Sequence, residues 1–473
     1  MDQLKLFMYL RLAILILLFF LVKWYLVIPT YVIGDFLFQR IFCLITGLTQ
    51  IPDGVGTFFV RIRLDDVVTG VTKQTVSSIQ DIADQFLRNS EKIVEMRSTV
   101  ISYMNNLYYK RATGKDLDKL WRDAFIEVQE EIHSQQDICD FLLRDKKTRV
   151  WTMDALQFRF YLFKNYSPTQ SAFCFKVNHG LVDGIGHFQL LNLLQDKFDI
   201  DNQPFMVQRT LKHRIILQLT RVIAPFFPLM KKPKLPKQSV LFEFDDKAED
   251  LSIGKYYDLP TIKTACKELQ CTVNDFMSTA FAQAFDKYAE YFKIEDMKEV
   301  YIQVVFNFRT KPICKEDVSL GCYSSSLPIH LKSPLKFPLE ECVKFHNEQT
   351  LEIKKNNFQR LSTYFFNILF YVLPVIVFAK PKSKSEEQHT RAISNVNGPP
   401  KPYQMGKTLT EKMHIFAIGP LQMFNLHVFS HNNYLSFSFL SSKMNIDCKK
   451  FAQFLEESMD DIIEKSQKLT KSK

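Results

Sequence analysis

The pattern of apolar and polar positions separates an apolar N-terminus from a long region of mixed structure. Every residue of 12–22 is apolar, and the apolar character continues through 24–28, with Lys23 as the only charge in between. About 20 apolar residues are enough to cross a bilayer. Bulky apolar residues follow in place of a small-residue cleavage site, which favours a retained membrane anchor over residues 7–33 against a cleaved signal peptide. Charges flank both ends, so the pattern leaves open whether the anchor spans the membrane or re-enters on the same side.

Two later segments are also lipophilic. Residues 205–240 contain eight Lys and Arg, no Asp or Glu, and interleaved apolar residues before a Pro- and Lys-rich end. This pattern fits a basic amphipathic helix at a membrane surface as well as a solvated crossover between two lobes. Residues 362–379 are nearly long enough to span a bilayer. A span there would separate the chain before it from the chain after it, so a buried or interfacial helix is expected.

The remaining chain predicts strands mixed with helices. Short aromatic and β-branched runs predict strands at 58–64, 158–163, 172–178, 301–308, 421–429 and 434–440. Amphipathic periodicity predicts helices at 76–88, 117–133, 187–194, 259–269, 272–285 and 451–465. The second and third strands are expected to form one hairpin, and the last two strands another. Because strands and helices are mixed throughout, the sequence indicates the α/β class, with mixed sheets in two lobes around one cleft.

These patterns divide the chain into four parts. We expect a membrane anchor and juxtamembrane segment at 1–50 and an N-terminal lobe at 51–204. A basic amphipathic crossover linker at 205–240 would then lead into a C-terminal lobe at 241–473. A chain of 473 residues is long enough for one large two-lobed unit of this kind.

Composition narrows the choice of partners. The net charge of +10 suits an anionic partner such as a lipid surface, a phosphorylated carrier or nucleic acid. No nucleic-acid-binding motif is present, so nucleic acid is not an expected partner. The nine cysteines form no C-x-x-C pair, which indicates reduced thiols on the cytosolic side and no metal site. The 43 phenylalanines fit an apolar substrate channel or membrane contact.

One short stretch carries the strongest chemical signal. Residues 176–186 read Lys-Val-Asn-His-Gly-Leu-Val-Asp-Gly-Ile-Gly, an H-x-x-x-D-G pattern directly after a predicted strand. His179 therefore lies at the end of a strand, where its side chain can project into a cleft as an acid–base group. The alternative is a core histidine at a tight turn. The Asp in register at 183, followed by Gly184, favours the functional interpretation.

Four blocks, in this order, carry a resemblance to the wax ester synthase/diacylglycerol acyltransferase family. Residues 178–184 resemble its H-H-x-x-x-D-G signature, and 272–275 resemble its T-x-N-D block. Residues 303–309 resemble a strand ending in V-x-x-R, and 393–399 resemble S-N-V-P-G-P. The blocks cover roughly residues 150–445. The chain departs from the family pattern at three places: Asn178 replaces the first His, Asn397 replaces a Pro, and 149–151 lack the usual Pro-Leu before Trp.

The resemblance implies a two-lobed coenzyme-A-dependent acyltransferase fold, here with an N-terminal membrane anchor. Acyl-CoA would be a co-substrate, and no bound cofactor is expected. His179 would take the proton of an attacking hydroxyl and then protonate the leaving thiolate, because imidazole exchanges protons near neutral pH. Direct transfer of this kind needs no acyl-enzyme. Asp183 would hold the turn through a buried ion pair, with Arg309 as candidate partner, and Gly184 would allow a backbone conformation or close approach that a Cβ blocks.

Donors for the developing oxyanion are less defined by the sequence. Asn274 is one candidate, although a helix-capping role fits it equally well. Ser394 and Asn395 could line the cleft from the C-terminal lobe or form a turn.

The resemblance implies an acyl-CoA-dependent O-acyltransferase that esterifies a long-chain alcohol to a wax ester. The alternative acceptor is diacylglycerol, giving triacylglycerol. A non-catalytic membrane lipid-binding protein is the alternative from another class, and a peptide-synthetase condensation domain fits less well because of the anchor. With membrane lipid as a further partner, the expected location is a membrane. The endoplasmic reticulum with a cytosolic catalytic part is favoured over a lipid droplet or the plasma membrane.

Overall fold

The computed structural model describes most of the chain. It covers residues 13, 14, 17, 24–51, 54–103, 106–206, 244–294, 300–307, 309–355, 390–420 and 423–471. The predicted linker from residue 207 onward and the apolar segment 362–379 lie outside the described residues. Of the apolar run 12–22, only three residues are described.

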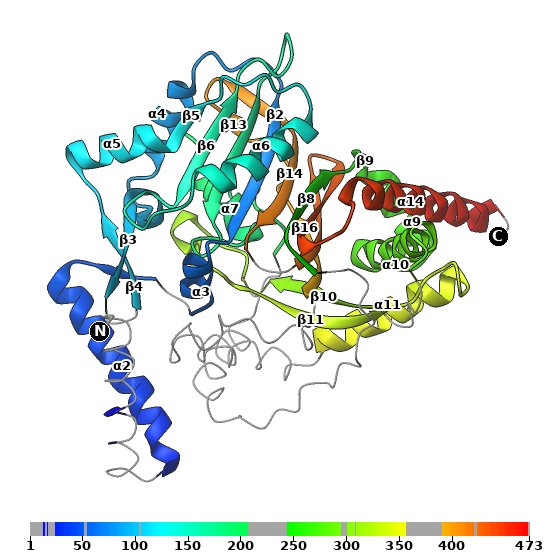
Figure 1. Cartoon of the computed structure of the whole chain (residues 1–473), viewed down its shortest axis with the longest axis horizontal. Helices are drawn as coiled ribbons and strands as arrows, with labels where there is room; N and C mark the ends of the chain where they lie inside the picture. The colour runs from blue at the N-terminus through cyan, green and yellow to red at the C-terminus, as the bar shows by residue number, and fades with distance from the viewer. Residues whose placement is uncertain are drawn as a thin grey trace.

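The N-terminal lobe is built on a six-stranded sheet with the order β13-β14-β2-β7-β6-β5 (Figure 1). Its strands are β2 (Asp65–Thr72), β5 (Phe125–Glu127), β6 (Phe158–Phe163), β7 (Ala172–Asn178), β13 (Gln404–Met405) and β14 (Thr408–Ile418). Its helices are α3 (Gly54–Ile62), α4 (Ile79–Asn89), α5 (Gly114–Ala124), α6 (Gln135–Thr148) and α7 (Gly184–Leu193). Helices α4, α5 and α7 pack on one face of the sheet, and α6 packs on the other, so both faces are buried.

The C-terminal lobe contains a seven-stranded mixed sheet. Its main order is β11-β10-β12-β15-β16-β8, and β9 pairs with β16. The strands are β8 (Phe244–Ile253), β9 (Tyr257–Asp258), β10 (Val300–Asn307), β11 (Ser324–Leu331), β12 (Thr390–Asn397), β15 (Met423–His431) and β16 (Tyr434–Met444). Helices α9 (Leu259–Glu268), α10 (Val273–Tyr291), α11 (Leu339–Lys355) and α14 (Cys448–Lys471) share one apolar core with this sheet. The 3₁₀ turn η3 (Lys315–Asp317) lies in the connection from β10 to β11.

Strand β14 joins the two lobes. It pairs antiparallel with β2, so residues 408–418 complete the N-terminal sheet although they fall within the predicted lobe 241–473. On β16, Ser436 Oγ donates to Met413 O at 2.9 Å and Ser438 Oγ donates to Ile415 O at 2.8 Å. The two sheets are therefore fastened along β14 by side-chain hydrogen bonds to its backbone.

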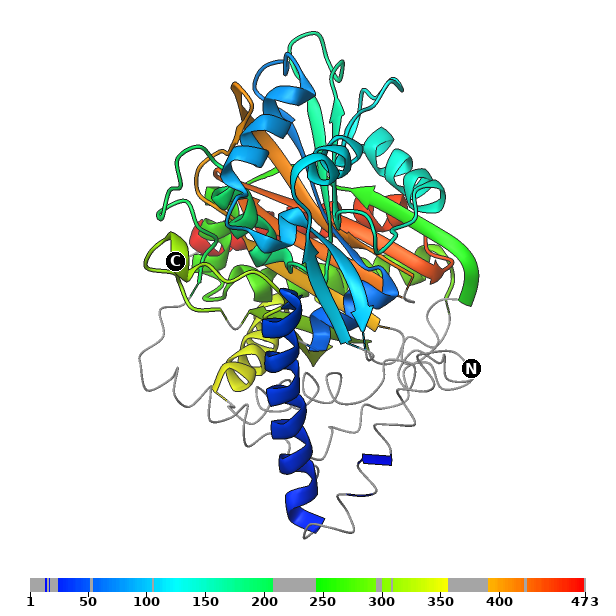
Figure 2. The same ribbon diagram turned by 90° about the vertical axis from the view of Figure 1, so that its left-hand side faces the viewer.

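Helix α2 (Trp24–Thr46) extends away from the two lobes, as both views show (Figures 1 and 2). Its second half rests on a small sheet of β1 (Thr49–Gln50), β4 (Asn106–Arg111) and β3 (Ser98–Tyr103), which the 3₁₀ turn η1 (Val94–Arg97) precedes. Phe42 stacks on Tyr103 with ring centroids 4.6 Å apart, and Tyr108 donates a hydrogen bond to Gln39.

The predicted membrane-spanning anchor is not supported by the described residues. No helix among them is both long and apolar enough to cross a membrane. Within α2, the charged residues Asp35 and Arg40 interrupt the apolar run, and Gln39 is buried against the small sheet.

Several predicted elements are confirmed, and two are wrong. The hairpins β6–β7 and β15–β16 and the helix after the glycine-rich turn are present. The strand predicted at 58–64 is wrong, because helix α3 runs to Ile62 and a left-handed residue, Arg63 at φ 60°, precedes β2. The helix predicted at 117–133 ends at Ala124, because the next three residues form the parallel edge strand β5 beside β6.

Candidate active site

His179 sits in a turn between strand β7 and helix α7. Its backbone N–H donates to Leu64 O at 2.7 Å, and the N–H of Gly180 donates to Asn178 Oδ1 at 2.9 Å. Asp183 then caps α7, with its side chain accepting from the N–H of Gly186 at 2.9 Å. The imidazole is half-buried, so it can meet a substrate while most of the turn is closed to solvent.

Gly180 allows α3 to pack against this turn. A Cβ at this position would lie 2.4 Å from Gly56 O and 2.4 Å from Val60 Cγ2. Real Cβ atoms do not approach backbone this closely, so a larger residue must push α3 and the turn apart. Phe59 of α3 also contacts the imidazole, with ring centroids 4.6 Å apart. A shift of α3 would therefore also move the His179 side chain.

We therefore expect Gly180→Ala to lower the free energy of unfolding by about 1–3 kcal/mol through overpacking, and to reduce activity. Urea unfolding and acyl-transfer rates measure the two effects. Gly34→Ala in α2 is the control, because nothing lies within 4 Å of a Cβ there. Equal stability of the two variants would contradict the close packing.

Cys322 lies beside the histidine, and no sequence motif predicted this neighbour. Its Sγ is 3.7 Å from His179 Nδ1, and its thiol donates to His179 O at 2.7 Å. Cys322 is not in a disulfide, and it is buried. A lone cysteine in the sequence could have been paired with His179 as a candidate neighbour. Because the chain has nine cysteines, the sequence does not single out Cys322.

Asp183 and Arg309 form a buried ion pair between the lobes. Arg309 Nη1 donates to Asp183 Oδ1 at 2.5 Å and to Oδ2 at 2.6 Å, and both side chains are almost fully buried. The N–H of Tyr323 donates to the same carboxylate at 2.8 Å. The structure thus brings together the two residues that the sequence proposed as partners.

The same arginine organises the loop that carries Cys322. Its Nη2 donates to Gly321 O at 2.5 Å and its Nε to Ser319 O at 3.2 Å. Burial by itself would raise the pKa of Asp183, but the Arg309 charge and the hydrogen bonds it receives lower it overall. Asp183 is therefore held as a carboxylate that fixes both the His179 turn and the loop.

Gly184 lies where strands of the two sheets approach the start of α7. A Cβ there would lie 3.0 Å from Val396 Cγ2 and 3.2 Å from Ile415 Cδ1. Side chains of β12 and β14 therefore approach this glycine closely, and even a methyl group here would require them to shift by a few tenths of an ångström.

The three oxyanion candidates occupy different environments. Asn274 is not the cap of α10, because Thr272 and Asp275 form a capping box there. Its Oδ1 instead accepts from Asn395 Nδ2 at 2.7 Å, which joins α10 to β12. Ser394 precedes Asn395 on β12, so its side chain points to the opposite face of the sheet. On that face it is paired in register with His427 of β15.

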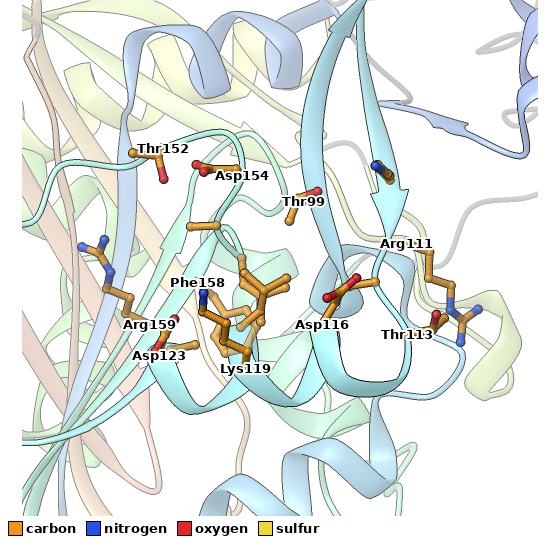
Figure 3. A pocket seen from close by; sticks show the side chains of 16 residues that line it. Thr99, Arg111, Thr113, Asp116, Lys119, Asp123, Thr152, Asp154, Phe158 and Arg159 are labelled. Carbon is orange, nitrogen blue, oxygen red and sulfur yellow. The ribbon is translucent and has the colours of Figure 1, made fainter.

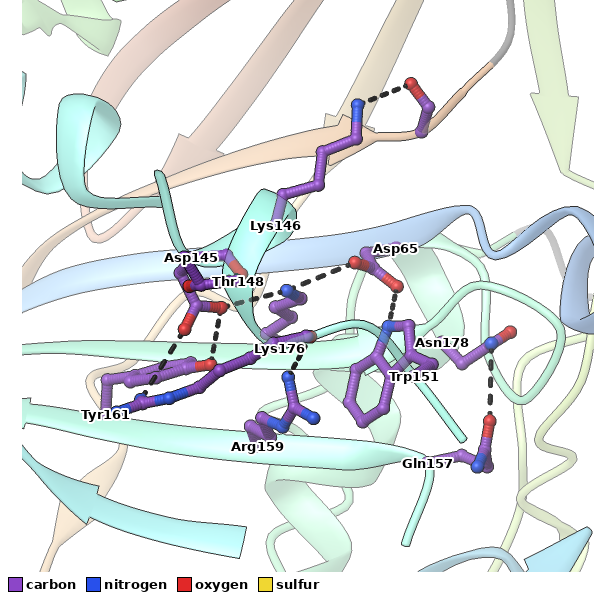
Figure 4. A network of polar contacts seen from close by, with 12 residues as sticks. Asp65, Asp145, Lys146, Thr148, Trp151, Gln157, Arg159, Tyr161, Lys176 and Asn178 are labelled. Carbon is purple, nitrogen blue, oxygen red and sulfur yellow. Dashed lines mark hydrogen bonds and ion pairs between the residues drawn. The ribbon is translucent and has the colours of Figure 1, made fainter. Parts of the chain in front are cut away.

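A buried lysine supports the strand that leads to His179 (Figure 4). Lys176 Nζ lies 3.2 Å from Asp145 Oδ2 and 3.4 Å from Asp65 Oδ2. Tyr161 donates to Asp145 at 2.7 Å, and Trp151 donates to Asp65. Burial raises the pKa of Asp65, although the Lys176 charge opposes this shift. These contacts tie α6 to β2 and β7, directly behind the H-x-x-x-D-G turn.

An open pocket of about 540 Å³ lies beside α5 and is not the candidate active site (Figure 3). Its lining includes Lys119, Arg159, Asp116 and Asp123, and it contains none of the residues predicted for catalysis. Within the part of the chain that the structure describes, no group of three His, Cys, Asp or Glu side chains could hold a metal ion.

The chain is similar to one known protein family and to several solved structures. Residues 320–463 match the family model of the WS/DGAT C-terminal domain. No curated protein matches the chain in sequence. The wax ester synthase/diacylglycerol acyltransferase of Marinobacter aquaeolei VT8 shares the fold, with TM-score 0.57 and 14% identity over 87% of this chain and 98% of that chain.

Two further solved structures share the fold at similarly low identity. A trichothecene 15-O-acetyltransferase from Fusarium sporotrichioides has TM-score 0.58 and 11% identity, covering 86% of this chain and 94% of its own. A starter condensation domain of rhizomide synthetase, solved with C8-CoA and Leu-SNAC, has TM-score 0.56 and 11% identity, covering 90% and 95%. The family model matches the predicted family over the C-terminal part of the chain, and the solved structures confirm the two-lobed fold.

Proposed function

We propose that this chain, an acyltransferase of the WS/DGAT family, transfers an acyl group from acyl-CoA to the hydroxyl of a long-chain alcohol with His179 as general base. The observation that carries the proposal is the half-buried imidazole at the end of β7, in a turn fixed by the buried Asp183–Arg309 pair. An imidazole held in this way can exchange a proton with a substrate without the turn having to reorganise.

A single residue, His179, can carry out both proton transfers of the reaction. His179 takes the hydroxyl proton as the oxygen attacks the thioester carbonyl, and a tetrahedral oxyanion forms. When the C–S bond breaks, the imidazolium returns the proton to the thiolate, so the products are an ester and free coenzyme A. The solved complex of a condensation domain with C8-CoA supports acyl-CoA as the donor, and the net charge of +10 suits its phosphates.

A long-chain alcohol is the proposed acceptor, which makes the product a wax ester. Diacylglycerol is the second candidate, because the Marinobacter structure of the same fold is named for both activities. The test measures thiol release from palmitoyl-CoA with hexadecanol or diacylglycerol added separately, and product lipids are resolved by chromatography. Acceptor-dependent release with a matching ester supports the proposal. Absence of release with both acceptors would leave the non-catalytic lipid-binding alternative.

Cys322 offers an alternative route through an acyl-enzyme, because a thiol beside an imidazole can be an activated nucleophile. Direct transfer does not use the thiol, so we expect Cys322→Ala to keep kcat within about threefold of the wild type, well short of the loss expected for an essential nucleophile. Mass spectrometry of protein quenched during turnover provides the second readout. An acyl adduct of +238 Da is not expected on direct transfer, and its appearance on Cys322 would show covalent catalysis.

Helix α2 supports a membrane-associated location. Its exposed apolar side chains include Leu37, Ile41, Leu44 and Ile45, with Leu44 85% and Ile45 80% exposed. A solvent-exposed apolar stripe of this kind favours insertion into the interfacial layer of a bilayer. We place the protein on a membrane facing the cytosol, with the endoplasmic reticulum as the first candidate and the lipid droplet or plasma membrane as alternatives.

The membrane proposal is tested by flotation of the full chain with phosphatidylcholine vesicles. We expect the wild type to float and a variant with Ile41, Leu44 and Ile45 replaced by Ser to remain largely in the dense fraction. A matched variant with three Ser substitutions at exposed apolar positions elsewhere, Tyr291, Ile313 and Leu335, should float like the wild type. Equal flotation of both variants would contradict a role for α2.

A further inference from the structure

Three buried polar side chains next to the candidate active site have atoms without hydrogen-bond partners. They are Asp66 on β2, His187 on α7 and His427 on β15. All three are at least nine-tenths buried. The unpartnered atoms are Asp66 Oδ2, both ring nitrogens of His187, and His427 Nδ1.

Asp66 links the other two groups. Its Oδ2 lies 3.8 Å from His187 Nδ1, and its position on β2 is paired in register with Val177, two residues before His179. Phe175 packs edge-on against His187, with ring centroids 5.0 Å apart.

His427 reaches the same region from the C-terminal sheet. Burial lowers the pKa of His427 to about 4, Asp66 opposes this shift, and His179 adds to it, so both groups lie within electrostatic range of the ring. At neutral pH the ring is therefore uncharged, with one nitrogen that donates and one that accepts a hydrogen bond.

Buried polar atoms of this kind are normally satisfied by ordered water or by a ligand. The hydrogen-bonding chemistry of these three side chains indicates which ligand group fits. A carbonyl oxygen or an oxyanion binds only to hydrogen-bond donors, so it does not suit the Asp66 carboxylate, which accepts hydrogen bonds. A hydroxyl both donates and accepts, so it matches a carboxylate combined with the neutral imidazole of His427.

We propose that Asp66, His187 and His427 form a polar subsite that binds a second hydroxyl of the acyl acceptor, on a carbon next to the one whose hydroxyl reacts at His179. The preferred acceptor is then a long-chain vicinal diol or a related polyol monoester instead of a simple alkanol. This inference rests on the proposed acyl transfer and specifies its substrate. His427 is a specificity-determining residue in this arrangement, because it lies within electrostatic range of both Asp66 and the base.

The test compares two acceptors that differ by one hydroxyl, hexadecanol and the vicinal hexadecanediol, with palmitoyl-CoA as donor. We expect the wild type to favour the diol in kcat/KM by about tenfold or more, the factor that corresponds to one well-formed hydrogen bond. His427→Phe should reduce this ratio about tenfold. His431→Phe is the matched control, because His431 is a buried histidine on the same strand that donates to Pro399 O at 2.8 Å and whose pKa is not affected by Asp66 or His179.

A second variant and a binding measurement test the subsite independently of His427→Phe. Asp66→Asn is nearly isosteric and should also lower the ratio, even if His427→Phe folds poorly. Binding of the two acceptors to His179→Ala protein reports on the subsite without turnover. A wild-type ratio near one, or a ratio unchanged in both subsite variants, overturns the inference. Diol-selective binding without any transfer by the wild type would instead refute the proposed function and retain the subsite.

Discussion

Replacing His179 with alanine is expected to lower kcat for acyl transfer by about 10²–10⁴-fold, the range by which a positioned general base accelerates such a reaction. The imidazole is the group at the end of β7 that can take the hydroxyl proton, and its turn is fixed by backbone hydrogen bonds that the substitution leaves in place. The loss should therefore appear in kcat with little change in the folded structure. Thiol release from palmitoyl-CoA measures the rate, and thermal unfolding checks the fold.

His133→Ala provides the control for this prediction. Its side chain is exposed and lies outside the site, so both activity and stability should match the wild type. If His179→Ala kept full acceptor-dependent activity, the base would have to be another group, and Cys322 would be the first to test.

Removing the arginine of the buried ion pair is expected to have the largest effect on stability. Arg309→Met should lower the free energy of unfolding by about 3–5 kcal/mol, the usual result of leaving a buried charge without its partner. The Asp183 carboxylate would keep only the N–H groups of Gly186 and Tyr323 as donors. Urea unfolding at neutral pH measures the difference, and activity should fall as well because the His179 turn and the Cys322 loop lose their common support.

The pH dependence of this effect has a defined sign. In the wild type the pKa of Asp183 is lowered, so the ion pair stabilises the fold above the ordinary carboxyl pKa of about 3.9 and this contribution is lost as the pH falls through the lower folded value. Without Arg309, burial dominates and raises the pKa of Asp183. The variant then gains stability relative to its neutral-pH value as the carboxyl becomes protonated. We therefore expect the stability difference between wild type and variant to shrink between pH 7 and about pH 4.

A double variant separates the charge from the packing. Asp183→Asn combined with Arg309→Met removes both charges, so it should recover part of the stability lost in Arg309→Met and show no such pH dependence. If the single and double variants unfolded alike at every pH, the buried carboxylate would not be the source of the cost.

Local signals in the sequence were sufficient for much of the fold near the site. The β6–β7 hairpin, the turn at His179 and helix α7 were all predicted, because strand alternation, glycine placement and the Asp183 cap act within a few residues of one another. The strand predicted at 58–64 is wrong because the local pattern there is misleading. Arg61 and Arg63 alternate with apolar residues as in a strand, while the turn at Gly180, against which α3 packs, is more than 100 residues away in the chain.

In the candidate site, too, some features follow from the local sequence and others from contacts between distant parts of the chain. That a histidine, an aspartate and a glycine occupy one turn between a strand and a helix follows from the local sequence, because neighbouring residues dictate that geometry. The surroundings of the turn come from contacts that are distant in the chain: Arg309 binds Asp183 across 126 residues, and Cys322 contacts His179 across 143. Strand β14 joins the N-terminal sheet from the far end of the chain, and the charge of Asp66 on β2 acts on His427 of the other sheet. Such contacts depend on the register and packing of whole sheets, which no local pattern specifies.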